Sequence, residues 1–358
     1  MNPSVDPAAT PQARDGQPKR RSKVWLWTKR LMTWSCFILV PVLLFMLVRN
    51  LDWQEVVQAL RSYKLSTLLL GGALALVSYM VFSSYDLLSR RYTGHRLPTT
   101  KVLPLAFVCY AFNLNLSSWV GGIALRYRLY GKLGLSVATI TKILSLGLVT
   151  NWLGYLLLGG VVFAMGLPAL PDSVKIGSTG LRLIGVAMVA AGVAYLLACR
   201  FAKRRTWTVR KQEITLPSFR FAALQAATGA LNWSLMGALI FTLLPEKADY
   251  LTVLAILLIS SIAGVITHIP AGLGVLETIF ISLLQGQYSK GALLAALIAY
   301  RALYFLVPLA IACVVYLVLE RKTRRGGTPE PAGNGEQPGE ATATAPGKGK
   351  GKGYSAVG

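Results

Sequence analysis

The chain has 358 residues, of which 54% are hydrophobic and only 14% are charged, and its formal net charge is +23. Soluble domains carry about 25% charged residues, and several apolar runs here exceed the roughly 18 residues that mark a membrane span, so the composition excludes an ordinary soluble enzyme. Lys and Arg stand in short clusters at the ends of these runs, which is typical of cytoplasmic membrane flanks and argues against nucleic acid as a partner.

Residues 1–22 are rich in Pro, Gln and charge and are typical of a disordered cytoplasmic tail. A basic cluster leads into a first span at about 31–48, and because no small-residue cleavage site follows, this span is predicted to be a retained anchor. Within 50–64, helical spacing of Trp53, Val56, Val57 and Leu60 predicts a short amphipathic helix on the membrane surface. Further spans are predicted over 65–89, 137–165, 181–199, 217–244 and 291–319, with a second disordered tail over 323–358.

Two apolar stretches fail as clean spans. Residues 102–132 break at Asn115, Gly121 and Gly122, and residues 251–287 break at Pro270, Gly272 and Gly274. If the basic clusters and both termini are cytoplasmic, each stretch must return to the side from which it enters. We therefore expect two re-entrant or broken helical hairpins, whose non-helical backbone survives at membrane depth only inside protein or beside water.

The chain is predicted to divide into two halves, about 31–165 and 181–320, within a transmembrane domain over 23–322. Each half holds a span, a span, a broken hairpin and a span, in opposite orientations. That order is the pattern of an inverted repeat, whose interrupted segments mark the substrate site in many transporters; the alternative is that two broken segments coincide by chance. The predicted fold class is all-α: a polytopic transmembrane helix bundle with about six full spans plus the two hairpins.

Charges at membrane depth mark a candidate substrate site. Each costs at least about 2.5–3.5 kcal/mol on insertion scales. A basic path for an anionic headgroup is predicted from Arg126, Arg128, Lys142 and Arg301, because guanidinium forks match phosphate. Glu277 is expected to pair with Arg301 or to meet an amine or a proton, and His268 adjoins the second break.

These residues also have structural interpretations. Arg126 and Arg128 are equally explained as cytoplasmic surface residues, and Lys142 as a side chain that extends to that surface. Arg301 and Glu277 would then be a structural pair, and His268 a hydrogen-bonded residue at a helix end.

Other polar and thiol groups are expected to play no part in a site. Asp86, near the cytoplasmic end of its span, is expected to face water. The four cysteines lie inside apolar runs without metal-ligand spacing, so neither a metal nor another cofactor is predicted.

Several motifs together resemble one family. The stretch His268-Ile269-Pro270-Ala271-Gly272-Leu273-Gly274-Val275-Leu276-Glu277, followed by Ala299-Tyr300-Arg301-Ala302-Leu303-Tyr304, resembles a signature of the lysylphosphatidylglycerol synthetase transmembrane-region (flippase-like) family, most closely its YbhN-like inner-membrane branch. The first half agrees through Ala111-Phe112-Asn113-Leu114, Ser118-Trp119-Val120-Gly121-Gly122, Arg126-Tyr127-Arg128-Leu129-Tyr130 and Thr150-Asn151-Trp152-Leu153-Gly154-Tyr155. The resemblance covers about residues 23–322. One departure is that Gly121-Gly122 stands where the broader family often has Gly-Glu.

The resemblance implies a lipid-handling protein of the bacterial inner membrane. In the bifunctional synthetases this region flips an aminoacylated phospholipid made by a separate soluble domain; only a predicted tail follows Arg325 here, so aminoacyl transfer is not implied. We expect a phospholipid flippase or transporter acting on an anionic phospholipid, and not an enzyme. The alternative is a non-transporting scaffold or accessory partner of a lipid-synthesis enzyme.

Overall fold

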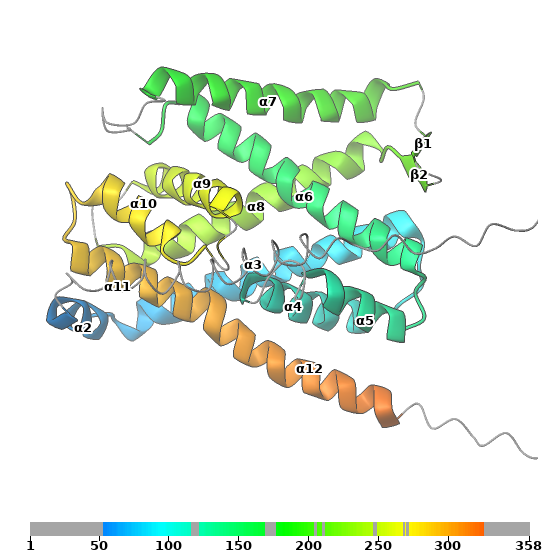
Figure 1. Ribbon diagram of the computed structural model, residues 1–358, viewed down its shortest axis with the longest axis horizontal. Helices are drawn as coiled ribbons and strands as arrows, with labels where there is room; N and C mark the ends of the chain where they lie inside the picture. The colour runs from blue at the N-terminus through cyan, green and yellow to red at the C-terminus, as the bar shows by residue number, and fades with distance from the viewer. Residues whose placement is uncertain are drawn as a thin grey trace, which may run out of the picture. The chain divides into compact units, whose positions relative to one another are not determined.

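The protein is a helical bundle in the computed structural model, which describes residues 53–115, 122–168, 177–203, 206–209, 212–245, 249–267, 269 and 272–325. The described helices, in chain order, are α2 (Trp53–Arg61), α3 (Leu65–Thr93), α4 (Thr99–Asn115), α5 (Leu125–Lys132), α6 (Val137–Ala164), α7 (Gly177–Phe201), α8 (Phe219–Leu243), α9 (Tyr250–Thr267), α10 (Val275–Leu284), α11 (Lys290–Arg301), the π-helix η3 (Ala302–Leu306) and α12 (Val307–Arg325) (Figure 1). Helices up to Leu317 belong to one compact unit.

Six helical segments among the described residues are long and apolar enough to cross a membrane: Leu65–Thr93, Val137–Ala164, Gly177–Phe201, Phe219–Leu243, Tyr250–Thr267 and Lys290–Arg321. The last of these runs through α11 and η3 into α12. At 1.5 Å per residue, α3 with 29 residues is about 44 Å long and α6 with 28 residues about 42 Å, and both exceed the roughly 30 Å hydrocarbon core. Large apolar side chains remain exposed on these membrane-spanning helices, such as Leu69 on α3 (65%) and Leu183 on α7 (67%). Water would disfavour such surfaces but lipid does not, so the predicted class of polytopic helical membrane protein is confirmed. The predicted first span, the first tail and residues 326–358 of the second tail lie outside the described residues, whereas residues 323–325 belong to α12.

One basic loop contains an unexpected strand pair. Strands β1 (Thr206–Val209) and β2 (Gln212–Thr215) pair antiparallel, with Thr206 opposite Thr215. β-Branched residues favour such a ribbon. The sequence did not predict it because Lys and Arg residues surround these short segments and mark the region as a basic loop. The hydroxyl of Tyr92 donates a hydrogen bond to the carbonyl of Thr215, which ties the ribbon to the end of α3.

In both broken stretches the two helical limbs form a hairpin that returns to the end of the bundle where it begins. Helices α4 and α5 have their outer ends where α3 and α7 end, and we call this the basic end of the bundle because Arg90, Arg91, Lys132 and Arg200 lie in those last turns (Figure 1). Helix α9 begins and helix α10 ends at the opposite end of the bundle, the end at which α2 also lies (Figure 1). The first limbs are enclosed by the rest of the bundle: residues 105–111 of α4 and 253–258 of α9 are buried without interruption. A helix that is apolar on every side requires such a setting.

Helix order repeats between the halves. Helices α8, α9, α10 and α11 begin 154, 151, 150 and 153 residues after α3, α4, α5 and α6 respectively. Helices α3 and α8 pack against each other in opposite directions (Figure 1). This arrangement is that of the predicted inverted repeat. The amphipathic helix α2 also forms as expected, and its Leu60 packs against Leu294 and Ala295 of α11.

The backbones of α6 and α8 approach each other closely where the two helices cross. A Cβ atom added to Gly154 would lie 2.2 Å from the carbonyl carbon of Gly229, and one added to Gly229 would lie 2.3 Å from the carbonyl oxygen of Thr150. Only glycine lets the two backbones approach this closely, as is common where membrane helices pack through small residues.

Gly154→Ala should therefore destabilise the protein by about 1–3 kcal/mol, the usual cost of an overpacked core. Thermal unfolding of the purified protein in detergent measures this effect. Gly147→Ala in the same helix is the matched control, since a Cβ there meets nothing within 4 Å. Equal stability of the two variants would contradict the close crossing.

The opposed hairpins predict opposite accessibility at their ends. In a background with all cysteines replaced by serine, Lys132→Cys at the end of α5 and Lys290→Cys at the start of α11 should react with a membrane-impermeant maleimide from opposite sides. Both positions are exposed, so access rather than burial decides the result. Labelling of both from the same side would exclude the inverted arrangement.

Candidate functional site

The second break is closed by a buried ion pair. Arg301, the last residue of α11, places Nη2 3.1 Å from Oε2 of Glu277 in the first turn of α10, and its Nε donates to Oε1. The two side chains are 15% and 7% exposed. The pairing of Glu277 with Arg301, expected as one of several possibilities, is present. Two opposite charges at this depth stabilise each other where either alone would be costly.

The same two residues satisfy backbone groups at the break. Glu277 Oε2 accepts a hydrogen bond of 2.9 Å from the N–H of Gly274, and Arg301 Nη2 donates to the carbonyl of Gly272 over 3.2 Å. Gly272 and Gly274 have φ angles of +56° and +80°, which side-chain-bearing residues rarely adopt. The break is therefore a glycine turn whose unpaired backbone groups are satisfied by a charged clamp of Arg301 and Glu277, as lipid-embedded backbone requires.

A π-helix follows the clamp directly. In η3 the backbone holds one extra residue per turn, a feature that is frequent at functional sites. Tyr304 at its centre is fully buried, with its hydroxyl 2.8 Å from Ser78 Oγ and 2.9 Å from the Tyr110 hydroxyl. Ser78 in turn donates to Asn232 Oδ1 over 2.8 Å. These four side chains join α3, α4, α8 and η3 through polar contacts in an otherwise apolar core.

The first break contacts the same π-helix. Asn115, the last residue of α4, donates through Nδ2 to the carbonyl of Phe305 over 3.2 Å and to that of Ala111 over 2.8 Å. The ring of Phe305 lies under the guanidinium of Arg301, with 5.5 Å between Cζ and the ring centroid. A chain of contacts therefore runs from the break of one hairpin through η3 to the break of the other.

A second buried ion pair lies nearer the basic end. Arg126 Nη2 is 3.0 Å from Oδ1 of Asp86, and the Tyr130 hydroxyl donates to Oδ2 over 2.7 Å. Asp86 is only 1% exposed, so the expectation that it faces water is wrong. The reason is that α5 folds back over the end of α3 and supplies a cation and a hydroxyl to the carboxylate, a contact that no local sequence pattern indicates.

The four predicted basic residues occupy unlike environments. Arg126 and Arg301 are each bound to a carboxylate inside the bundle, whereas Arg128 and Lys142 are exposed. Lys142 lies five residues into α6 but Arg301 lies eleven into α11, so the two occupy different depths despite the repeat. The structure thus brings Arg301, Glu277, Gly272 and Gly274 together and keeps Arg126, Arg128 and Lys142 apart from them.

Some predicted residues lie outside the described part of the chain, namely His268, Pro270 and Gly121. Gly122 is described and packs so closely that a Cβ there would lie 2.5 Å from Asn113 Oδ1. Sequence reasoning missed Tyr304, Ser78 and Asn232. All three are polar residues in the middle of apolar helices. In a membrane protein this position indicates that the side chain forms a hydrogen bond with another helix inside the bundle.

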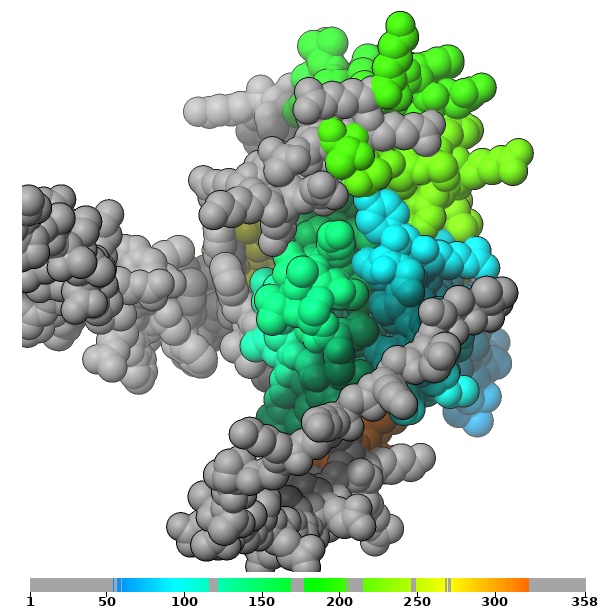
Figure 2. Space-filling view, turned by 90° about the vertical axis from the view of Figure 1, so that its right-hand side faces the viewer, coloured from blue at the N-terminus to red at the C-terminus, as the bar shows by residue number. Residues whose placement is uncertain are grey.

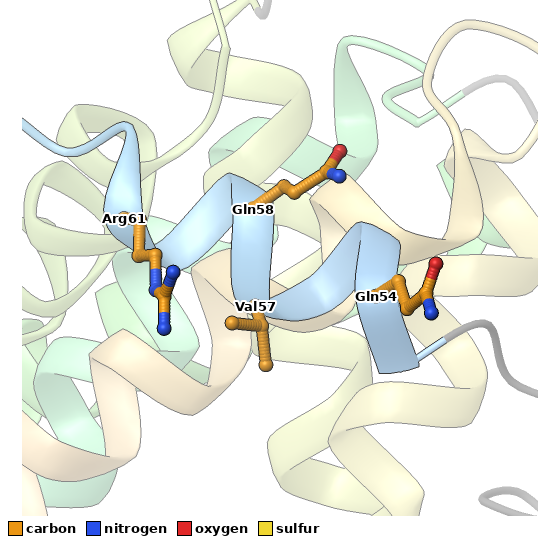
Figure 3. A pocket seen from close by; sticks show the side chains of 4 residues that line it. All are labelled: Gln54, Val57, Gln58 and Arg61. Atoms are coloured by element: carbon orange, nitrogen blue, oxygen red, sulfur yellow. The ribbon is translucent and has the colours of Figure 1, made fainter.

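One shallow pocket lies along α2 and not at the breaks. It is lined by Gln54, Val57, Gln58 and Arg61, a single helical face, and its volume is about 370 Å³ (Figure 3). All four residues are exposed and come from one helix, so the feature is a surface groove without converging ligands.

Two hairpins joined through a π-helix beside a charged clamp make this a polytopic helical membrane protein. The chain belongs to the family of the lysylphosphatidylglycerol synthase transmembrane region, whose model matches residues 32–312. It is 48% identical over 302 residues to the inner membrane protein YbhN of Escherichia coli (strain K12), covering 84% of this chain and 95% of that protein. It is also 30% identical over 285 residues to a Synechocystis sp. protein, slr0712, covering 78% of this chain and 88% of that protein.

Removing one partner of the Asp86–Arg126 pair should destabilise the fold. Asp86→Asn leaves the Arg126 charge buried without its counter-ion, which costs about 3–5 kcal/mol. Thermal unfolding in detergent checks this, and the double variant Asp86→Asn/Arg126→Gln should recover part of the loss because no buried charge remains. Strictly additive losses would show that the two side chains do not depend on each other.

Proposed function

We propose that this protein moves an anionic phospholipid across the bacterial inner membrane, in which it spans the bilayer several times. The observation that carries the proposal is the contact chain from Asn115 through η3 to the clamp of Arg301 and Glu277. It joins two opposed re-entrant hairpins at membrane depth, where interrupted helices form substrate sites in other transporters. The family and the relative named an inner membrane protein support the membrane and the lipid class.

Arg301 is the proposed headgroup ligand. Its guanidinium already holds a carboxylate through two donors, and a phosphate diester presents a similar pair of oxygens. An entering headgroup would compete with Glu277 for the fork. Because Glu277 and Arg301 also hold Gly274 and Gly272, displacement of the pair would loosen the glycine turn. Headgroup binding and hairpin movement are coupled in this proposal through the same hydrogen bonds.

Other predicted residues take lesser roles in the proposal. Arg126, held by Asp86, supports the first hairpin, whereas exposed Arg128 and Lys142 attract anionic headgroups toward it. The basic end is assigned to the cytoplasm by the positive-inside rule, which makes both termini cytoplasmic. Transport in this proposal needs no metal, other cofactor or catalytic group.

The test is flipping in proteoliposomes that contain fluorescent phosphatidylglycerol, read by reduction of the outer-leaflet label with dithionite. Arg301→Ala and Glu277→Ala should each lower the initial rate by at least about tenfold, since a hydrogen bond to a charged group contributes about 1.5–3 kcal/mol. Lys290→Ala, which removes one exposed charge from the same helix as Arg301, is the matched control and should keep the rate.

Normal flipping by both clamp variants would overturn the proposed site. Absence of flipping by the wild-type protein, together with co-purification of a lipid-modifying enzyme, would favour the alternative role as a non-transporting partner. Fluorescent phosphatidylcholine in the same assay tests headgroup charge, and equal rates for both lipids would contradict selection of an anion.

A further inference from the structure

A separate pocket lies at the basic end, in the corner between α3 and α4. It has a volume of about 370 Å³ and is lined by Leu87, Arg90, Arg91, Gly94, His95 and Thr99. Gly94, with φ of +70°, ends α3 and turns the chain toward α4, and its N–H donates to the carbonyl of Arg90 over 2.9 Å. Arg90 Nη1 donates to Thr99 Oγ1 over 3.0 Å and so bridges the two helices. Figure 2 views the bundle from this end, where the cyan atoms of the end of α3 lie next to the green atoms of α5 and α6 (Figure 2).

The pocket is strongly cationic. Two of its six lining residues are arginines and none is acidic. The neighbouring carboxylate of Asp86 is buried and already receives Arg126 and Tyr130. Within the described ranges, neither Arg90 nor Arg91 forms an ion pair. Two guanidinium groups without a carboxylate partner among the described residues therefore line the same small pocket, which favours the binding of an anion there.

His95 adds an unused polar group. Both ring nitrogens are buried, and neither has a hydrogen-bond partner among the residues that the structure describes. The ring packs near that of Tyr130, with 6.5 Å between centroids. Burial, and then the charge of Arg90, lowers the pKa of His95, and the Asp86 carboxylate opposes this effect only in part. A buried nitrogen without a partner is costly, and an anion in the pocket would both accept its hydrogen bond and raise that pKa.

The surroundings favour a lipid over a free ion. Val77, Met80, Leu87 and Arg91 follow one another at helical spacing along a single face of α3. Val77 and Met80 are 48% and 43% exposed, so this face offers apolar surface directly below the pocket. Acyl chains can lie against it while the headgroup reaches the arginines at the membrane surface.

We propose that this pocket binds the phosphate group of an anionic phospholipid from the leaflet at the basic end, with Arg90, Arg91 and His95 as its ligands. The phosphate oxygens accept from the two guanidinium groups and from one ring nitrogen of His95, and the chains lie along α3. The pocket is distinct from the clamp of Arg301 and Glu277, and it binds lipid whether or not the protein transports it.

Titration calorimetry of the full chain in detergent tests this with three soluble probes. Short-chain phosphatidylglycerol should bind; short-chain phosphatidylcholine, whose phosphate is internally neutralised, should bind about tenfold more weakly. Glycerophosphoglycerol carries the same phosphodiester without acyl chains and should also bind more weakly. If glycerophosphoglycerol matches the lipid, the ligand is a free phosphate ester and the lipid assignment is overturned.

Variants locate the site. Arg91→Gln and His95→Gln should each weaken phosphatidylglycerol binding about tenfold, because each removes one hydrogen bond to a charged group. Arg96→Gln is the matched control, since Arg96 is exposed in the same turn but does not line the pocket, and it should change affinity less than about twofold. Arg91→Lys should restore part of the affinity. Equal weakening by Arg91→Gln and Arg96→Gln would reduce the pocket to general surface charge and overturn the proposal.

Binding and transport separate in this design. Loss of flipping in the clamp variants with unchanged calorimetry would leave the pocket intact, whereas binding that tolerates both Arg91→Gln and His95→Gln would refute the pocket and leave the proposed transport untouched. The His95 resonance in the wild-type protein gives an independent readout: its pKa should rise when phosphatidylglycerol is added, and an unchanged pKa would contradict direct contact.

Discussion

Backbone polarity inside an apolar medium is the constraint on which the rest of this structure depends. Each interruption of a helix exposes N–H and C=O groups that lipid cannot satisfy. Here the clamp of Arg301 and Glu277 supplies a donor to the carbonyl of Gly272 and an acceptor to the N–H of Gly274. The two charges that satisfy the backbone groups of the break are themselves stable in this apolar setting only because they neutralise each other. The turn and the ion pair are therefore mutually dependent, and loss of one exposes the other.

The two halves solve this problem differently. The second half uses a charged pair at the break itself, whereas the first uses the amide of Asn115 near its break and keeps its ion pair, Asp86 with Arg126, closer to the basic end. The repeat is thus one of helix order and direction and not of chemistry. For the proposed function, this asymmetry suits a substrate with a charged head and apolar chains, since its two ends need unlike surroundings.

Much of the architecture could be predicted because hydropathy and charge act locally. Long apolar runs determined the spans, and the glycine and asparagine residues at 115, 122, 272 and 274 marked the broken segments. The contacts of the site were less accessible: the pair of Arg301 with Glu277 was one expected possibility, but the burial of Asp86 depends on α5, forty residues away in the chain. Tyr304 was missed because a tyrosine in an apolar run carries no sign of its partners, which come from α3 and α4.

The π-helix has a geometric consequence for the last helix. An α-helix turns by about 100° per residue, so the extra residue held in η3 sets the side chains that follow back by about that angle around the helix axis. The side chains of α12 before Leu317 therefore face a direction that an uninterrupted helix from Lys290 would not give them, and Tyr316 meets Phe112 of the first hairpin with 6.1 Å between ring centroids. The insertion thus decides which side chains of this part of α12 face the first hairpin.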